Sequence, residues 1–398
     1  MFYISPFSTM DKRFKEHSYA LALAMVLLFV VDLFTNDISW VRSHADMENY
    51  KLLFTNGLSA EGLQAPYAYR FLPAYLAKGL SSVFNIEMLQ AFAWLSRGAL
   101  LLFLWLLYFF VRAQKAGMLT ATFTVLAVSL SFCNVKFLLF DGTRPDALGM
   151  LFVLLAYFFM VKGRFWALLL ITIVGLQVRE FTLVPLLVYL IHNFKKQAYT
   201  TTVVGILAVM AAVLLPRILI DVETNLQFVP FNGSGPSKFV NRVLLNWARH
   251  LNILFVLSAY MLPVLLIWAY QGFKKINWIG SKPITYTLGV MVLLFLGGTD
   301  LARFAAYLFV PMVLLLAHNG SEVKPVVLLL VAIALFWFNR IGQQIPFEDA
   351  EAYRDFYGGV NDRLNAALGW RWIQMGALVF GFYALGMGQK KSRLEAGK

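Results

Sequence analysis

Residues 37–84 read DISWVRSHADMENYKLLFTNGLSAEGLQAPYAYRFLPAYLAKGLSSVF, and they are the first long segment of the chain that is not predominantly apolar. An apolar stretch precedes this segment and several follow it, so it separates one membrane-spanning helix from the rest. Its last part, 71–84, is too short and interrupted to cross a bilayer, which takes about 20 apolar residues. Apolar residues on one side, with Lys78 and Ser82 on the other, predict a helix lying in the membrane interface. We therefore expect 37–84 to be an outer-face first loop containing interfacial helices.

The composition places the chain in the membrane class. Of its 398 residues, 60% are hydrophobic and 14% are charged, and the mean hydropathy is +0.68, whereas a soluble domain carries more charge. Because cysteine occurs once and the five histidines are scattered, we expect neither an internal disulfide nor a histidine-based metal site. Recurring apolar runs predict a single all-α domain over 1–398, a polytopic membrane helix bundle of about 12 transmembrane helices. The expected spans are 19–36, 90–111, 118–139, 146–161, 165–179, 181–194, 200–219, 251–271, 284–299, 303–317, 325–340 and 366–387.

The distribution of charged residues predicts how the bundle is oriented. Every connection on the side of the N-terminus is short and basic, and short basic loops stay in the cytoplasm. Of the 21 acids, only Asp11, Glu16, Glu322 and Glu395 fall on that side. Both termini are then cytoplasmic, and the loop 37–84 faces outward. The inner basic residues are mostly lysine and the outer ones mostly arginine, which holds phosphate through a planar bidentate fork.

Two acids of the first outer loop are candidates for proton transfer. Asp46 and Glu48 are separated by one residue, and Tyr50 follows closely. One carboxylate could act as a general base towards an attacking hydroxyl group, and the other could orient it or bind a divalent metal ion such as Mg²⁺ or Mn²⁺. Asp37 is the alternative base. The competing interpretation is that these are solvated loop acids.

Arginines beside short polar turns are candidates for binding an anionic lipid headgroup. Arg70 follows Tyr69 just before the expected interfacial helix, at the depth of lipid phosphates. Arg144 lies in a second outer turn that begins at Asp141 and ends at Asp146. Asp146 also suits the first turn of the next helix, where a carboxylate meets the positive end of the helix dipole. That capping role does not explain the other two charges of this turn.

Two further pairs of charged residues lie at the outer ends of expected spans. Arg179 and Glu180 are consecutive and interrupt two apolar runs, and ionisable residues at membrane depth usually face a cavity. We interpret Arg179 as a phosphate contact, the alternative being a structural Arg179–Glu180 ion pair. Asp300 could cap a helix or belong to the site, with Arg303 in the first turn of that helix.

This order of features resembles the GT-C superfamily of polytopic membrane glycosyltransferases, which use polyprenyl-phosphate sugars. The resemblance lies in one helix, an outer loop with ADMENY (45–50), a tyrosine–arginine turn and an interfacial helix. Residues 145–187 resemble the two helices and the short basic turn that follow the second outer loop of that superfamily. Residues 297–311, GGTDLARFAAYLFVP, resemble a D-x-x-R…P element of related envelope-polysaccharide proteins. The resemblance implies a catalytic aspartate at Asp46 and phosphate-binding residues at Arg70, Arg144, Arg179 and Arg303.

The resemblance implies a bacterial inner-membrane enzyme that moves a sugar from a polyprenyl-phosphate-linked donor to an envelope glycan or lipid acceptor. The active site would face the periplasm, the outer loops 221–250 and 343–365 would meet the acceptor, and no nucleic acid would be involved. One alternative is a polysaccharide polymerase or ligase that uses a lipid-diphosphate-linked saccharide. A second is a flippase or transporter of lipid-linked sugars, although the sequence shows no two-fold internal repeat.

Overall fold

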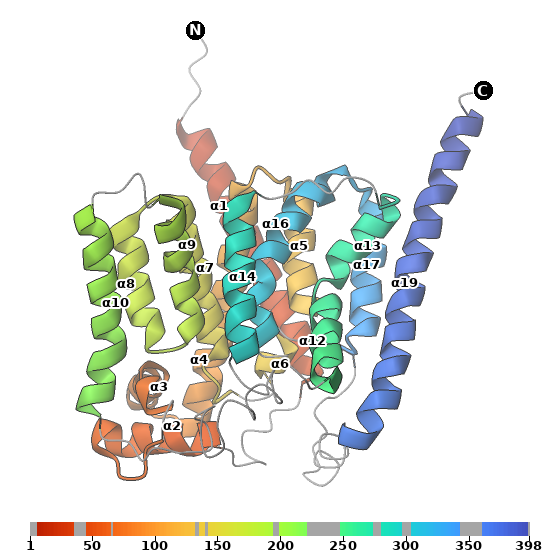
Figure 1. The fold of residues 1–398 in the computed structure, drawn as a ribbon. Coiled ribbons are helices and arrows are strands. Elements are labelled where there is room, and N and C mark those ends of the chain that lie inside the picture. The colour runs from red at the N-terminus through yellow and green to blue at the C-terminus, as the bar shows by residue number, and fades with distance from the viewer. Residues whose placement is uncertain are drawn as a thin grey trace.

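The computed structural model is an all-α protein (Figure 1). It describes residues 6–35, 45–64, 67–131, 135–139, 142–193, 199–220, 247–273, 280–296, 304–342 and 360–396. The helices are α1 (Pro6–Leu33), α2 (Ala45–Asn56), α3 (Leu72–Phe84), α4 (Met88–Ala113), α5 (Met118–Leu130), α6 (Lys136–Leu139), α7 (Asp146–Val161), α8 (Phe165–Leu176), α9 (Leu183–Asn193), α10 (Tyr199–Leu219), α12 (Trp247–Tyr260), α13 (Leu262–Tyr270), α14 (Ser281–Leu296), α16 (Phe309–Asn319), α17 (Pro325–Phe338) and α19 (Val360–Ala396). Short 3₁₀ helices include η1 (Gly57–Ser59), η2 (Tyr67–Tyr69), η3 (Glu180–Thr182), η6 (Ala306–Leu308) and η7 (Gly320–Glu322).

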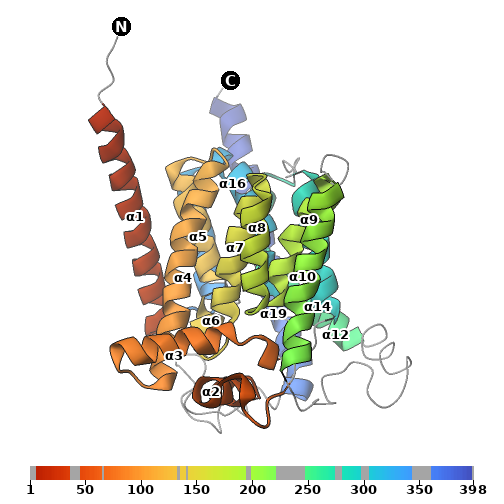
Figure 2. The same cartoon turned by 90° about the vertical axis from the view of Figure 1, so that its left-hand side faces the viewer.

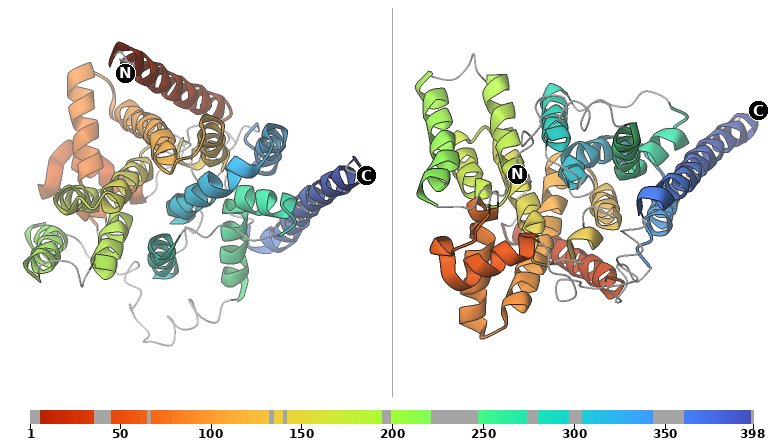
Figure 3. Two further views of the ribbon diagram at one scale, coloured as in Figure 1. Left: turned by 90° about the horizontal axis from the view of Figure 1, so that it is seen from above. Right: turned by 60° about the horizontal axis from the view of Figure 1, so that its bottom comes forward.

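Most helices run up and down in one bundle, whereas α2 and α3 lie across its end (Figures 1 and 2). These two helices cover the end of the bundle beneath α7, α8 and α10, whereas α12 and α19 stand at the other side (Figures 1 and 3). The beginning of α1 and the end of α19 extend from the opposite end of the bundle (Figure 1). The segment expected to form an outer loop therefore lies at one end, and the basic chain termini project from the other.

Each expected span contains helix, and three helices among the described residues are long and apolar enough to cross a membrane by themselves. These three are Arg13–Leu33 within α1, Met88–Ala113 and Tyr199–Leu219. Other apolar helices, such as α7 and α17, are shorter than the length that a simple span needs. Large apolar side chains along α10 are exposed, from 37% for Val204 to 77% for Leu219. Continuous exposed apolar surface of this kind is typical of a helix that faces lipid.

The expected span 118–139 is not one continuous helix. The helix α5 ends at Leu130, and the short helix α6 begins only at Lys136. The buried Nζ of Lys136 donates to the backbone oxygens of Phe34 and Ile341, both at 2.8 Å. These oxygens lie just beyond the C-terminal ends of α1 and α17, where a helix dipole favours a cation. The break thus places a lysine that joins two helix ends.

Two ion pairs join α1 to α4. Arg97 lies 3.0 Å from Asp32, and Arg112 lies 2.6 Å from Glu16. All four side chains are about one-third exposed. Pairs with this exposure contribute up to about 1 kcal/mol each, so they fix the register of the two helices more than they stabilise the fold.

The segment that contains α2 and α3 has a small apolar core of its own. Tyr50 and Leu53 from α2, Ala74 and Ala77 from α3, and residues at the start of α4 form this cluster, which is separate from the main core of the bundle. The cluster also includes Ile220, at the end of α10. The loop is therefore packed onto the bundle as a cap, and its position relative to α10 is fixed by burial of apolar surface.

The prediction of a helix over 71–84 is confirmed by α3. Pro73 stands in its first turn, where its missing N–H costs nothing, and Asn85 ends it in the left-handed conformation with φ of 52°. The side facing the protein consists of small residues, whereas the larger apolar residues Tyr75 and Leu76 are about 40% exposed. Small residues let α3 lie flat on the bundle and turn its larger apolar side chains outward.

Candidate functional site

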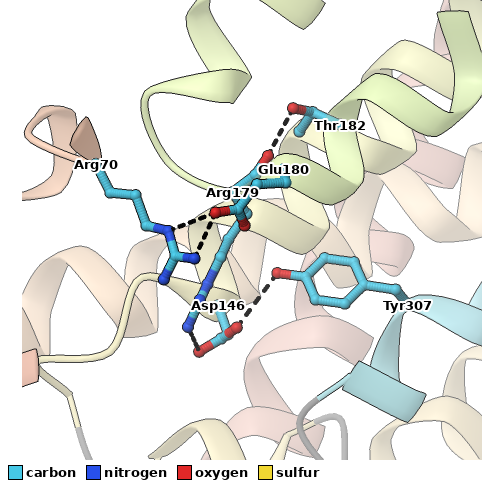
Figure 4. A network of polar contacts seen from close by, with 6 residues as sticks. All are labelled: Arg70, Asp146, Arg179, Glu180, Thr182 and Tyr307. Carbon is cyan, nitrogen blue, oxygen red and sulfur yellow. Dashed lines mark hydrogen bonds and ion pairs between the residues drawn. The ribbon is translucent and has the colours of Figure 1, made fainter. Parts of the chain in front are cut away.

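A buried ion pair joins two helices beneath the capping loop. Nη2 of Arg179 donates to Oδ2 of Asp146 at 2.7 Å, and the two side chains are 1% and 0% exposed (Figure 4). Asp146 is the first residue of α7, and Arg179 follows α8. Removing both charges from water costs several kcal/mol per ion, so each group depends on the other. The buried Nε of Arg179 makes no hydrogen bond within the described part of the chain.

Tyr307 of η6 completes this buried network from a third segment. Its hydroxyl donates to Oδ1 of Asp146 at 3.4 Å (Figure 4). Its ring also stacks on Phe181 with a centroid distance of 4.1 Å. The backbone oxygen of Tyr307 accepts a hydrogen bond of 2.7 Å from the hydroxyl of Tyr286 in α14. Stacking and hydrogen bonding together hold the Tyr307 ring against the ion pair.

Two glycines make room for the buried pair. A Cβ atom on Gly149, one turn after Asp146, would lie 2.5 Å from the Tyr307 hydroxyl and 2.9 Å from Cγ of Arg179. A Cβ atom on Gly175 would lie 2.7 Å from Cγ2 of Thr182, whose hydroxyl donates to the backbone oxygen of Arg179 at 2.8 Å. A contact under 3 Å forces a neighbouring group to shift, so close packing favours glycine at both positions.

A second ion pair connects the same turn to the capping loop. Nε of Arg70 donates to Oε1 of Glu180 at 3.0 Å, and Nη2 donates to the same oxygen (Figure 4). The Arg70 side chain is 11% exposed and that of Glu180 is 44% exposed. Burial by itself raises the pKa of Glu180. The guanidinium groups of Arg70 and Arg179 lower this pKa by more than burial raises it, so it lies below its usual value. Glu180 is therefore ionised at neutral pH.

The turn between α8 and η3 also fixes the loop and α10 through its backbone and through Gln177. The backbone N–H of Leu72 donates to the oxygen of Gln177 at 3.3 Å, and Nε2 of Gln177 donates to the oxygen of Ala212 at 3.2 Å. At the end of α10, the exposed guanidinium of Arg217 lies 4.6 Å from the ring centroid of Tyr69. Arg70 thus lies where the capping loop, the turn after α8 and the end of α10 meet.

Four of the residues expected at the site come together in this network. The residues that share it are Arg70, Asp146, Arg179 and Glu180. The alternative of an Arg179–Glu180 ion pair is wrong, because each residue pairs with a different partner. The expected place of Asp146 in the first turn of a helix is confirmed, and its side chain also pairs with Arg179.

The remaining expected residues are distributed around the network or lie outside the description. Tyr50 is buried in the loop core, 6.1 Å from the Phe92 ring centroid. Glu48 is exposed and pairs with Lys51 at 3.3 Å on its own helix, and Tyr69 and Arg144 are half-buried. Asp46 stands in the first turn of α2, but its side chain is not described. The residues that lie outside the described ranges are Asp37, Asp141, Asp300 and Arg303, together with most of the loops 221–250 and 343–365.

Three contributors to this region were not expected from the sequence. Tyr307 lies in the 297–311 element, but nothing in its apolar surroundings distinguishes it from a core tyrosine. Gly149 carries a weak signal, a glycine within an apolar helix one turn after an acid. Arg217 follows Pro216 at the outer end of an apolar run, a position that is also typical of an arginine anchored at the interface.

Within the described residues, no group of three acidic, histidine or cysteine side chains is placed to hold a metal ion. Since the side chains of Asp37 and Asp46 are not included, the expectation of a metal at the first loop stays a prediction. The ionic network itself contains as many arginines as carboxylates, so its own residues compensate one another.

Comparisons of the chain with protein-family models, with curated proteins and with solved structures find no match.

Proposed function

We propose that the protein is a membrane glycosyltransferase that moves a sugar from a polyprenyl-phosphate-linked donor to an envelope glycan or lipid acceptor. The bundle would cross a bacterial inner membrane about twelve times, with both termini in the cytoplasm and the capping loop in the periplasm. The position of α2 and α3 across one end of the bundle, opposite to the beginning of α1 and the end of α19, supports this topology. The resemblance to the GT-C superfamily supports the reaction.

One observation supports the proposal: Arg70 lies beside α3, at the edge of the capping loop, and its side chain is not fully buried. Its side chain is 11% exposed, and it stands two residues before α3, whose larger apolar side chains face outward. A lipid phosphate would meet the protein at this depth, with its chain along exposed apolar surface such as that of α10. A guanidinium fork can bind two phosphate oxygens at once.

The proposed reaction assigns a separate role to each group. Asp46 would take the proton of an acceptor hydroxyl as its oxygen bonds to the anomeric carbon of the donor sugar. The bond between that carbon and the phosphate oxygen would break, and the polyprenyl phosphate would leave with the electron pair. Arg70 would stabilise the negative charge that develops on the phosphate. The buried Arg179–Asp146 pair would act as a positioning element that holds the turn carrying Glu180.

The proposal is tested by sugar transfer with purified protein in detergent. The donors would be undecaprenyl-phosphate-linked aminoarabinose, mannose and glucose, each offered with an envelope extract and without any ion gradient. We expect transfer of single sugar units by the wild type and loss of transfer in Asp46→Asn, by about 100-fold or more, because the base is removed. Glu61→Gln, which changes an exposed acid of the same loop, is the matched control and is expected to stay active.

Each alternative predicts a different result in this assay. Transfer of preassembled saccharide blocks from a lipid diphosphate would indicate a polymerase or ligase. After reconstitution of the protein into liposomes, movement of lipid-linked sugar across the bilayer without transfer would indicate a flippase. Full activity of Asp46→Asn with correct folding would contradict the assignment of the base, and Asp37→Asn would then be the next variant.

A further inference from the structure

Arg179 and Glu180 are neighbours in the chain, but their side chains have opposite surroundings. The backbone of Arg179 is extended, with φ of −156° and ψ of 140°, so successive side chains point to opposite sides. Arg179 faces inward to Asp146 and is 1% exposed, whereas Glu180 faces the capping loop and is 44% exposed (Figure 4). Of these two ion pairs, only the outer one, Arg70–Glu180, can change partners without leaving a fully buried charge unpaired.

The outer pair, Arg70–Glu180, does not use all of the hydrogen-bonding groups of its two side chains. Both hydrogen bonds of Arg70 end on a single oxygen of Glu180, Oε1. A guanidinium has five N–H donors and a carboxylate has two acceptor oxygens, so each partner retains bonding capacity. An incoming anion can therefore bind Arg70 before Glu180 leaves, and the exchange does not pass through an unpaired arginine.

The charge balance of the network determines which group leaves when an anion binds Arg70. The network holds two arginines and two carboxylates, and its formal charge is zero. Adding a phosphate would leave an excess negative charge in a region of low dielectric, which is costly unless one carboxylate moves away. Glu180 is the carboxylate that can move, because it is nearly half exposed and can be hydrated, whereas Asp146 is fully buried.

We propose that Glu180 occupies the place of the lipid phosphate on Arg70 in the empty protein, and that the phosphate of a polyprenyl-phosphate lipid displaces it. This inference rests on the proposed function, because it specifies how the donor phosphate reaches Arg70. The hydrogen bond from Leu72 to Gln177 does not involve either side chain, so the loop stays attached during the exchange. Glu180 would be released next to the bound headgroup, where its pKa would rise as Arg70 is neutralised.

The proposal predicts that removing the competing carboxylate strengthens binding. The probe is undecaprenyl phosphate, which carries no sugar, added to the full-length protein in detergent and measured by native mass spectrometry. Glu180→Gln is expected to bind it about tenfold more tightly than the wild type, since one charge-assisted competitor worth about 1.4 kcal/mol is lost. Arg70→Gln is expected to weaken binding, and Glu61→Gln is the matched control with an unchanged dissociation constant.

If Glu180 only braces the loop, its removal loosens Arg70 and binding weakens or stays the same. Either result with a folded Glu180→Gln protein would overturn the proposal. If that variant does not fold, Glu180→Asp serves in its place, because it keeps the charge while shortening the side chain. It is expected to give a smaller gain in affinity, and an unchanged or lower affinity would again overturn the proposal.

Further probes identify the source of the phosphate group. Inorganic phosphate and phosphatidylglycerol in nanodiscs carry an anionic phosphate without the polyprenyl chain, and phosphatidylcholine nanodiscs provide a zwitterionic control. An increase in affinity for undecaprenyl phosphate that exceeds the increase for the other probes supports the lipid donor. Equal increases for inorganic phosphate would instead assign the site to free phosphate.

Binding and transfer are measured independently, so the two proposals can fail separately. Tighter binding in Glu180→Gln together with no sugar transfer by the wild type would retain the exchange and reject the glycosyltransferase. Sugar transfer by the wild type without tighter binding in the variant would retain the enzyme and reject the exchange.

Discussion

The two ion pairs made by residues 179 and 180 use the same chemistry in different surroundings. Arg179–Asp146 is sealed inside the bundle with both side chains at most 1% exposed, and Arg70–Glu180 lies at the edge of the capping loop. A buried pair cannot lose one member cheaply, because the other remains as an uncompensated charge. An outer pair can lose a member to water or to another ion. The inner pair therefore holds the structure in place, whereas Arg70 of the outer pair can exchange Glu180 for another anion.

The largest expected effect comes from breaking the inner pair. Asp146→Ala leaves Arg179 buried without its carboxylate and is expected to destabilise the protein by about 3–5 kcal/mol. The measurement is thermal unfolding in detergent together with the yield of monodisperse protein. Asp32→Asn is the matched control, since it breaks an aspartate–arginine pair that is one-third exposed and is expected to cost at most about 1 kcal/mol.

A double variant distinguishes loss of a brace from loss of packing. Asp146→Leu combined with Arg179→Met replaces both charges with apolar groups and is expected to recover much of the lost stability. Failure of the double variant to recover, with a cost equal to that of Asp146→Ala, would show that the shape of the site matters more than its charges. An unchanged unfolding temperature in Asp146→Ala would contradict the role of the inner pair altogether.

A smaller effect is expected from filling the space next to the inner pair. Gly149→Ala places a methyl group 2.5 Å from the Tyr307 hydroxyl, so the tyrosine or Arg179 must shift, at a cost of about 1–3 kcal/mol. Gly98→Ala in α4 is the matched control, because no atom lies within 4 Å of its added Cβ. Since alanine is the better helix former, Gly98→Ala is expected to stabilise the protein by about 0.5–1 kcal/mol.

Thermal unfolding of both glycine variants provides the measurement. If Gly149→Ala were as stable as the wild type, the contact between the added methyl group and the Tyr307 hydroxyl would relax without cost. The packing of Tyr307 against the inner pair would then not require glycine at position 149. If it lowers the affinity for undecaprenyl phosphate as well as the stability, the position of the inner pair affects Arg70 through the shared turn.

The sequence predicted the positions of many helices and which residues share one end of the bundle, because both depend on local or additive properties. Apolar runs gave the helices, and the basic residues of the short connections gave the end of the bundle to which Arg70, Asp146, Arg179 and Glu180 belong. The amphipathic pattern of 71–84 predicted α3, although the side that contacts the protein is made of its small residues. These small residues allow α3 to approach the bundle closely, and a hydrophobicity pattern does not indicate which side of a helix can do so.

The pairing of charges could not be predicted in the same way. Whether Arg179 meets Glu180 or Asp146 depends on one extended residue in the turn after α8, and on a glycine that leaves space on α7. Tyr307 reaches the pair from a segment about 160 residues away along the chain. Such contacts are set by tertiary packing, and short-range sequence patterns contain no information about them.

The smallest expected effect is the pH dependence of the outer pair, and it tests whether Glu180 is coupled to Arg70 in the folded protein. The pKa of Glu180 is lowered in the folded state from an ordinary value of 4.5, so the folded protein binds fewer protons near that pH than the unfolded chain. The stability that Glu180 contributes is therefore complete above about pH 5 and is lost as the pH falls through its lowered pKa. The difference in unfolding temperature between wild type and Glu180→Gln should shrink between about pH 6 and about pH 3.5, whereas Glu61→Gln should show no such trend. A difference that stays constant over this range would mean that the carboxylate gains nothing from Arg70, and the outer pair would then be neither a brace nor a competitor for phosphate.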